Sequence, residues 1–254
     1  MTPVGDVTVT AAPPALETSA LTLRAAGRTL VRQLDWQVRP GERWCVIGRN
    51  AVGKSSLLRA LAGLPVPGRD GEIRWFGRLQ GDWSAGDAAA LRAWMPQQVG
   101  DRFAIEVNRL IELSVVRHTG ESADAVLAAL DAQTLAGRSV LELSGGERQR
   151  IALAQCRMQG SPLMLLDEPV SFQDPAHQAL VARWLHGQSD RALVITAHDV
   201  NWMAGVATHV LALYGDGDWE AGPAASLLSR DLLRRVYGCD WRDVGGAWVV
   251  VTPG

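Results

Sequence analysis

Residues 44–55 read Trp-Cys-Val-Ile-Gly-Arg-Asn-Ala-Val-Gly-Lys-Ser, an apolar run followed by a glycine-rich turn. The apolar run predicts a buried strand, and the leucine spacing that follows predicts a helix over 55–62. From Gly48 onward the turn has the phosphate-loop spacing G-x-x-x-x-G-K-S, which surrounds a polyphosphate with backbone N–H groups and a helix N-terminus. In such a loop Lys54 reaches the β- and γ-phosphate oxygens and Ser55 binds Mg²⁺. The stretch therefore predicts a nucleotide-binding α/β domain.

Lys54 is the only lysine of the chain, because the other 24 of its 25 basic residues are arginines. A lysine carries a slim, flexible point charge, whereas the guanidinium of arginine is a broad planar fork. The single lysine thus stands at the position where a phosphate loop needs a slim cation. This placement argues against an accidental Gly-Lys pair in an ordinary turn.

The composition excludes several classes of protein. With 254 residues, 47% hydrophobic and 20% charged, the chain is long and apolar enough to bury a core. A net charge of −2 gives no global basic field, so sequence-independent nucleic-acid binding is not expected. The three widely spaced cysteines (Cys45, Cys156, Cys239) favour buried thiols in a reducing compartment. We expect neither a signal peptide nor a membrane-spanning segment.

Periodicity along the chain predicts one large α/β domain. Residues 1–19, rich in Ala, Pro and Thr, are expected to form a flexible arm before a single domain over 20–254. Alternation from Leu21 predicts an antiparallel β layer, 72–79 reads as a strand, and about 98–142 reads mainly as helices. Helix and strand then alternate, which predicts a parallel sheet. The expected helices are 146–159, 176–186 and 201–204, and the expected strands are 163–166 and 192–196.

An apolar run at 163–166 ends in two acids, Asp167 and Glu168. A buried parallel strand would deliver both carboxylates to its C-terminal edge, where open α/β sheets bind ligands. This is the Walker B pattern, in which Asp167 suits Mg²⁺ through water and Glu168 orients or deprotonates an attacking water. A solvated acidic pair at a strand end is the alternative, and the phosphate loop upstream disfavours it.

Residues 143–150 read Leu-Ser-Gly-Gly-Glu-Arg-Gln-Arg and are expected to open a helix. With this motif the sequence, over about 21–241, resembles the ATP-binding cassette (ABC) ATPases. The resemblance implies a P-loop NTPase (RecA-like) core with a parallel sheet, an N-terminal antiparallel β subdomain and an inserted helical subdomain at about 98–142. It also implies that Ser144, Gly145 and Gly146 hold the γ-phosphate of a nucleotide bound to a partner subunit.

The resemblance assigns further residues. Gln97 is similar to the Q-loop glutamine, with Gln98 the weaker choice, residues 171–174 to the D-loop, and His198 to the switch histidine. Structural roles are expected for the other histidines, which are His118, His177, His186 and His209. The implied catalytic residues are Glu168, His198, Lys54 and Gln97. The implied nucleotide ligands are Gly48, Asn50, Ala51, Gly53, Lys54, Ser55, Ser56, Ser144, Gly145 and Gly146. The implied Mg²⁺ ligands are Ser55, Gln97 and Asp167.

Four departures from the family pattern stand out. Ala51 replaces a glycine of the phosphate loop, and we expect it to avoid positive φ, which would strain the loop by about 1 kcal/mol. Ala25 stands near the position of the aromatic residue that stacks on adenine, so adenine selectivity is open. Val170 and the Phe172-Gln173 pair also differ from the family. No catalytic group is missing, which disfavours an inactive ATPase.

The resemblance implies a subunit that binds and hydrolyses ATP with Mg²⁺ to power an ABC transporter. Two copies would bind head to tail around two nucleotides. Separate transmembrane permease subunits would dock on the cytoplasmic face of the cell membrane, near Gln97 and 98–142. The tail at 232–238, with Gly222-Pro223 before it, resembles that of ATPases serving importers of iron-siderophore, haem or cobalamin complexes.

Two other classes of function are disfavoured by the sequence. A soluble ABC-type ATPase of DNA repair or translation would carry coiled-coil insertions, paired cassettes or basic arms, and heptads are absent from the sequence. No nucleic-acid partner is therefore expected. A nucleotide or small-molecule kinase is opposed by residues 144–147 and by the lack of an evident acceptor lid.

Overall fold

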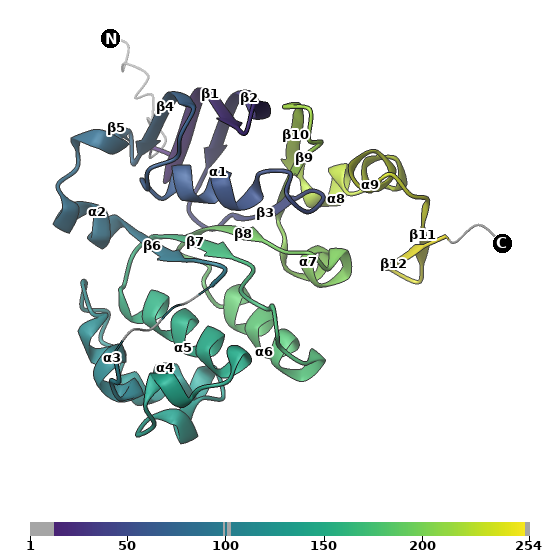
Figure 1. Ribbon diagram of the computed structural model, residues 1–254. Coiled ribbons are helices and arrows are strands. Elements are labelled where there is room, and N and C mark those ends of the chain that lie inside the picture. The colour runs from purple at the N-terminus through teal and green to yellow at the C-terminus, as the bar shows by residue number, and fades with distance from the viewer. Residues whose placement is uncertain (1–12, 99, 101–102, 252–254) are drawn as a thin grey trace, which may run out of the picture.

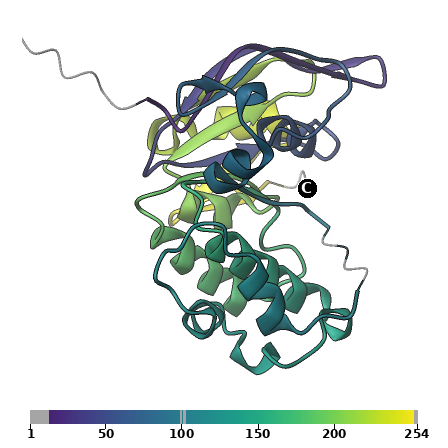
Figure 2. The same cartoon turned by 90° about the vertical axis from the view of Figure 1, so that its left-hand side faces the viewer.

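The computed structural model describes residues 13–98, 100 and 103–251 and is shown in Figure 1. A four-stranded antiparallel sheet and a six-stranded mixed sheet form its upper part, and most of the helices lie below them. Figure 2, turned by 90°, shows the same arrangement, with the antiparallel sheet and the helices α3 to α5 at opposite ends. No helix in the described part of the chain is long and apolar enough to cross a membrane.

The antiparallel sheet has the order β2-β1-β4-β5. Its strands are β1 (Leu16–Ala25), β2 (Arg28–Val38), β4 (Arg69–Trp75) and β5 (Arg78–Leu79). The predicted antiparallel layer is confirmed, but β1 begins inside the expected flexible arm, so that prediction is wrong for residues 16–19. Leu16 is fully buried and Thr18 is 2% exposed, so this short run packs as one face of a strand. Residues 1–12 of the expected arm lie outside the described residues.

The predicted strand over 72–79 is instead a hairpin. Phe76 and Gly77 both adopt positive φ, at 49° and 81°, and turn the chain between β4 and β5. Two consecutive left-handed residues make the tight turn that joins antiparallel strands. Phe76 hides this turn in the sequence, because a bulky residue rarely adopts positive φ.

The six-stranded sheet has the order β10-β9-β3-β8-β7-β6. Its parallel strands are β3 (Arg43–Ile47), β6 (Arg92–Met95), β7 (Leu163–Asp167), β8 (Ala192–Thr196) and β9 (His209–Leu213), and β10 (Trp219–Pro223) pairs antiparallel to β9 at the edge. Its two faces belong to two apolar clusters. Trp44 and Val46 pack toward the antiparallel sheet and α1, and Cys45 and Ile47 pack toward the other helices. Because both faces are covered, the central strands are continuous apolar runs.

The helices cover this sheet on both sides. Their bounds are α1 (Lys54–Leu61), α2 (Ala85–Leu91), α3 (Val107–Leu113), α4 (Ala123–Ala129), α5 (Gly145–Met158), α6 (Pro175–His186), α7 (Val200–Val206), α8 (Ala224–Leu227) and α9 (Arg230–Tyr237). Short 3₁₀ turns occur at Gln80–Asp82, Gln133–Leu135 and Val140–Glu142, and a C-terminal hairpin joins β11 (Trp241–Val244) to β12 (Ala247–Val250). The expected helical stretch at 98–142 therefore contains α3, α4 and two of the 3₁₀ turns, which pack with α5.

Candidate active site

The phosphate loop joins β3 to α1, and α1 begins at Lys54. The N-cap residue Gly53 has φ 115°, no side chain caps this end of the helix, and its first turn holds no acid. A Cβ on Gly53 would lie 2.9 Å from Cβ of Leu30, and a Cβ on Gly48 would lie 2.9 Å from the carbonyl oxygen of Leu213. Both positions thus require glycine. The open N–H groups and the helix dipole favour an anion here.

Ala51 occupies the left-handed region with φ 59°. The prediction that it avoids positive φ is therefore wrong. The loop has to reverse between β3 and α1, and the N–H of Val52 donates to the carbonyl of Arg49 at 3.3 Å across this reversal. Alanine at such a position costs about 1 kcal/mol relative to glycine. The phosphate loop therefore holds Ala51 in a left-handed conformation that alanine does not favour.

The Lys54 side chain is buried, with the residue 6% exposed. Its ammonium donates to the carbonyl oxygens of Gly48 at 2.8 Å and Arg49 at 3.1 Å, so it folds back over its own loop. Burial lowers the pKa of Lys54 below its usual 10.5, and the carboxylates of Glu168 and Asp167 oppose that shift. These two acids therefore help keep the lysine cationic.

Asp167, the last residue of β7, is 2% exposed. Its Oδ1 accepts from the hydroxyl of Thr196 at 2.6 Å, and the Ser55 hydroxyl also bonds to it. The parallel register that pairs Asp167 with Thr196 explains the first contact. Burial raises the pKa of Asp167, and the bonds from Thr196 and Ser55 oppose that shift.

A hydroxyl and a carboxylate are the oxygen ligands that Mg²⁺ takes from proteins. Mg²⁺ usually keeps several waters and uses only one or two carboxylates plus substrate phosphates. Within the described residues no cluster of three or more His, Cys, Asp or Glu could hold a metal ion. The Ser55 and Asp167 pair therefore fits Mg²⁺ bound with a nucleotide and does not fit an all-protein metal cage.

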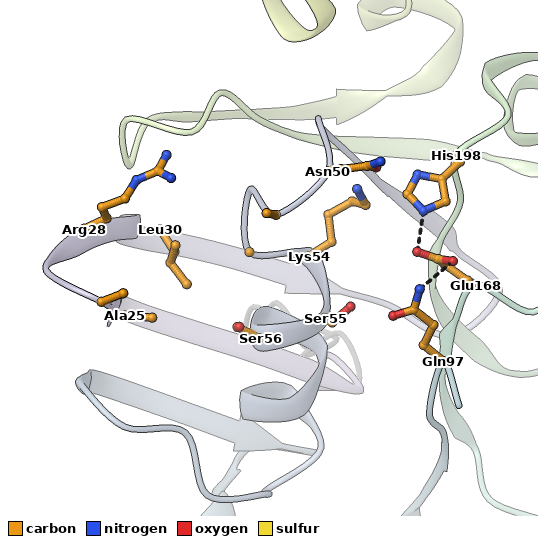
Figure 3. Close-up of a pocket in the computed structure, with 13 residues that line it drawn as sticks. Ala25, Arg28, Leu30, Asn50, Lys54, Ser55, Ser56, Gln97, Glu168 and His198 are labelled. Atoms are coloured by element: carbon orange, nitrogen blue, oxygen red, sulfur yellow. Dashed lines mark hydrogen bonds and ion pairs between the residues drawn. The ribbon is translucent and has the colours of Figure 1, made fainter. Parts of the chain in front are cut away.

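Glu168 has three side-chain partners at the C-terminal edge of the sheet, and Figure 3 shows two of them, Gln97 and His198. Its Oε1 lies 2.5 Å from Nε2 of His198, and its Oε2 accepts from Nε2 of Gln97 at 2.9 Å and from the hydroxyl of Ser171 at 2.9 Å. Gln97 and His198 follow β6 and β8, the two neighbours of β7. The sheet order thus brings together three residues that are far apart in sequence.

The sequence reasoning missed two residues that hold the backbone of Glu168. Glu168 has φ 52°, its N–H donates to the hydroxyl of Thr196 at 2.9 Å, and its carbonyl accepts from Nε2 of Gln149 at 3.0 Å. Gln149 is 3% exposed, and its Oε1 has no hydrogen-bond partner among the residues that the structure describes. The sequence does contain a signal for Gln149. This polar residue lies on the same helix face as the apolar residues Leu153 and Cys156, where a polar side chain needs a partner.

A cavity of about 560 Å³ connects these groups. One end holds the phosphate loop together with Gln97, Glu168 and His198, and the other end is the tip of the β1–β2 hairpin (Figure 3). Its described lining residues are Ala25, Ala26, Arg28, Leu30, Asn50, Ala51, Gly53, Lys54, Ser55, Ser56, Gln97, Glu168 and His198. No aromatic ring other than the imidazole of His198 is among them. The predicted phosphate, acid and histidine residues therefore share one cavity.

Ser144, Gly145 and Gly146 do not line that cavity. They lie at the N-terminus of α5, where Ser144 and Glu147 form a capping box, with the Ser144 N–H donating to Glu147 Oε2 at 2.7 Å. That bond lowers the pKa of Glu147. Phe172, 80% exposed and at φ 63°, lies against Gly145. In a single copy, the serine-glycine tip and Lys54 are not brought together.

Comparison with known proteins gives consistent matches. The family model described as "ABC transporter" matches residues 31–171, more than half of the chain. A protein of Streptomyces coelicolor named hemin import ATP-binding protein HmuV is 36% identical over 227 residues, covering 85% of this chain and 81% of its own length. The protein of that name from Pseudomonas aeruginosa is 35% identical, with 89% and 93% covered.

Solved structures share the fold. A chain of an inward-facing metal-chelate type ABC transporter has a TM-score of 0.74 at 24% identity and covers 93% of this chain and 96% of its own. A bacterial Atm1-family ABC exporter with ATP bound has a TM-score of 0.73 at 24% identity, covering 89% of this chain and 42% of its own. Because an exporter matches as well as a metal-chelate transporter does, the fold alone does not set the direction of transport.

Proposed function

This chain belongs to the ABC transporter family, and we propose that it is the ATPase subunit that powers import of haem or a related metal chelate. Family membership supports ATP binding and ATP hydrolysis, and the curated relatives named above are import ATP-binding proteins. One observation carries the residue assignment. The carboxylate of Glu168 is held by Gln97, Ser171 and His198 at the cavity that Lys54 lines.

Each end of the site has a distinct task in the proposed reaction. Lys54 and the N–H groups at the start of α1 bind the triphosphate, together with Gly48, Asn50, Ala51, Gly53 and Ser56 of the loop. Glu168 accepts a proton from the attacking water, and His198 and Gln97 fix the direction of its two oxygens. When bound to Ser55, Asp167 and Gln97, Mg²⁺ would neutralise charge on the β- and γ-phosphate oxygens.

A second copy of the chain is proposed to complete the site. Dimerisation agrees with family membership, and we place the Ser144 hydroxyl and the Gly145 and Gly146 amides of one copy against the γ-phosphate held by its partner. Two observations support this arrangement. Ser144 and Gly145 are exposed, and neither lines the cavity of its own Lys54. The signature residues thus have no nucleotide to bind within one copy.

Transmembrane permease subunits are the second kind of partner. A small cavity of about 270 Å³ is lined by Trp94, Leu113 and Val116 together with Pro96, which directly precedes Gln97 in the sequence. Leu113 is 61% exposed and Val116 is 45% exposed, and Phe103 is 80% exposed. Exposed apolar side chains around a cavity suit a partner helix. We propose that a permease docks here, which would place the chain at the cytoplasmic face of the membrane.

The cargo and the domain limits also stay proposals. The names of the curated relatives favour haem among the three chelates that the tail suggests, which are iron-siderophore, haem and cobalamin. The single domain over 20–254, with a helical subdomain at about 98–142, remains a prediction. Its first strand begins earlier than expected, at Leu16.

The alternative function is a soluble ATPase that acts on nucleic acid. Nucleic acid would stimulate the ATPase activity of such a protein, whereas membranes that contain the permease would stimulate that of a transporter subunit.

The experiment that tests the role of Glu168 is Glu168→Gln. We expect this variant to bind ATP, to dimerise with it and to hydrolyse it at least about 100-fold more slowly, because an amide cannot accept the proton. Glu72→Gln, which changes an exposed acid on the antiparallel sheet, is the control and should keep full turnover. Near-normal hydrolysis by Glu168→Gln would refute the assignment of the base.

A further inference from the structure

The two ends of the active-site cavity differ in chemistry. The phosphate end carries a lysine, an acid, a histidine and three side-chain hydroxyl or amide groups of the loop and α1. At the hairpin end, Ala25 and Ala26 offer only methyl groups, and Leu30 is 7% exposed and packs beside Gly53. Among the described lining residues, Arg28 supplies the polar side chain at that end, as Figure 3 shows.

The Arg28 side chain is held beside the cavity. Its Nη2 donates to the carbonyl oxygen of Gly215 at 3.3 Å, in the turn between β9 and β10. The same turn is attached to β2 by a bond from the N–H of Arg32 to the carbonyl of Gly217 at 2.8 Å and by a bond from Arg32 Nη2 to the carbonyl of Asp216 at 3.1 Å. Because the partner of Arg28 is a neutral carbonyl, its charge is not neutralised by that contact.

A guanidinium is suited to a nucleobase in two ways. It is planar, weakly hydrated and stacks on aromatic faces, and every base has such a face. Its N–H groups are donors only, so they suit the acceptor atoms of a purine, N7 of adenine and N7 and O6 of guanine. No lining side chain at the hairpin end could accept a hydrogen bond from the amino group of adenine. The side chains there do not distinguish adenine from guanine.

We propose that Arg28 binds the base of the nucleoside triphosphate through its guanidinium plane, and that the cavity accepts guanine nucleotides as well as adenine nucleotides. The proposal rests on the proposed function, since the base reaches the hairpin end only when the triphosphate lies on the phosphate loop. It assigns the base-binding role to a residue outside the phosphate loop and the two acidic positions.

The test measures equilibrium binding of ATP, GTP and inorganic tripolyphosphate to the full chain by titration calorimetry. For the wild type we expect dissociation constants for ATP and GTP within about threefold of each other. Arg28→Ala should weaken both nucleotides by about 5- to 30-fold, the range of a cation–π contact. It should change tripolyphosphate by less than about twofold. Arg28→Trp restores a flat surface and should recover most of the nucleotide affinity.

The matched control is Arg24→Ala, which removes an exposed arginine of the same hairpin that does not line the cavity. It should leave all three affinities unchanged. Unchanged nucleotide binding by Arg28→Ala, or an equal loss for tripolyphosphate, would overturn the base contact. Discrimination against GTP by more than about tenfold in the wild type would overturn the relaxed base selection. If the wild type bound none of the three ligands, the proposed function itself would fail.

Discussion

The helices α1 and α5 begin at the two ends that meet phosphate in the proposed dimer, and they are built in opposite ways. The first turn of α1 has a glycine N-cap, no side-chain cap and no acid, and its lysine is buried. The first turn of α5 has a complete capping box between Ser144 and Glu147, and its tip is exposed. The α1 end leaves its N–H groups open for an anion, and the α5 end satisfies two of its N–H groups, those of Ser144 and Glu147, within the chain.

This difference assigns nucleotide binding to the α1 end and dimer assembly to the α5 end. In the proposed function the N-terminus of α1 holds a nucleotide in one copy, because no side chain of the described residues caps it and the ammonium of Lys54 lies beside it. The N-terminus of α5 is stable without any nucleotide, and the carboxylate of Glu147 occupies part of it. A single copy should therefore bind nucleotide at α1 alone, and α5 should contribute only when a second copy arrives.

The largest expected effect comes from Lys54→Ala. Loss of the ammonium should weaken ATP binding to a single copy by about 10- to 150-fold, since a charged hydrogen bond contributes about 1.5–3 kcal/mol. Ser144→Ala is the comparison and should leave ATP affinity of a single copy unchanged while weakening the dimer. Titration at protein concentrations below dimerisation measures both. Equal losses in the two variants would erase the distinction between the helix ends.

An intermediate effect is expected from Gln149→Leu, which removes the contact from α5 to the carbonyl of Glu168 in the same copy. The turnover number should fall by about tenfold, because a freed carbonyl lets the base leave its left-handed conformation. ATP affinity should change less than about twofold. Gln188→Leu is the control, since this glutamine is also 3% exposed and donates to a backbone carbonyl, that of Trp184. An equal fall of turnover in the control would show a general loss of stability.

The smallest effect is expected from Ala51→Gly in the loop before α1. Glycine adopts φ 59° without penalty, so the free energy of unfolding should rise by up to about 1 kcal/mol. Denaturant unfolding of the nucleotide-free protein measures it. Gly120→Ala is the reverse change at φ 79°, where nothing lies within 4 Å of the added carbon, and it should destabilise the protein by a similar amount. A destabilised Ala51→Gly variant would show that the methyl group contributes packing.

The motifs, which require a residue type at a fixed spacing, predicted residues that lie close together in the structure. Lys54, Glu168 and His198 meet at one cavity because parallel strands end at one edge of the sheet. The strand over 192–196 was predicted to the residue, since β8 is a continuous buried apolar run. The roles of these residues remain predictions until the variants are measured.

Local backbone conformation was less predictable. Ala51 takes positive φ against its own preference, because the loop must reverse between β3 and α1. Phe76 does the same where a hairpin turns. Leu16 becomes part of a strand only because β2 and β4 flank it on both sides. Gln149 donates a hydrogen bond to the carbonyl of Glu168, which is 19 positions away in sequence. Each of these depends on tertiary contacts that a local pattern does not contain.

The chain has a single side-chain amine, the one on Lys54, and it is nearly enclosed by the loop that it serves. An acylating reagent that modifies lysine therefore has one side-chain amine as its target in the whole protein, and that amine is the group proposed to bind the triphosphate. Mass spectrometry of the peptides after brief acylation separates Lys54 from the N-terminal amino group, and so reads the accessibility of this one side chain without any engineered label. Filling the loop shields that amine, so the fraction of protein that escapes modification measures the occupancy of the site.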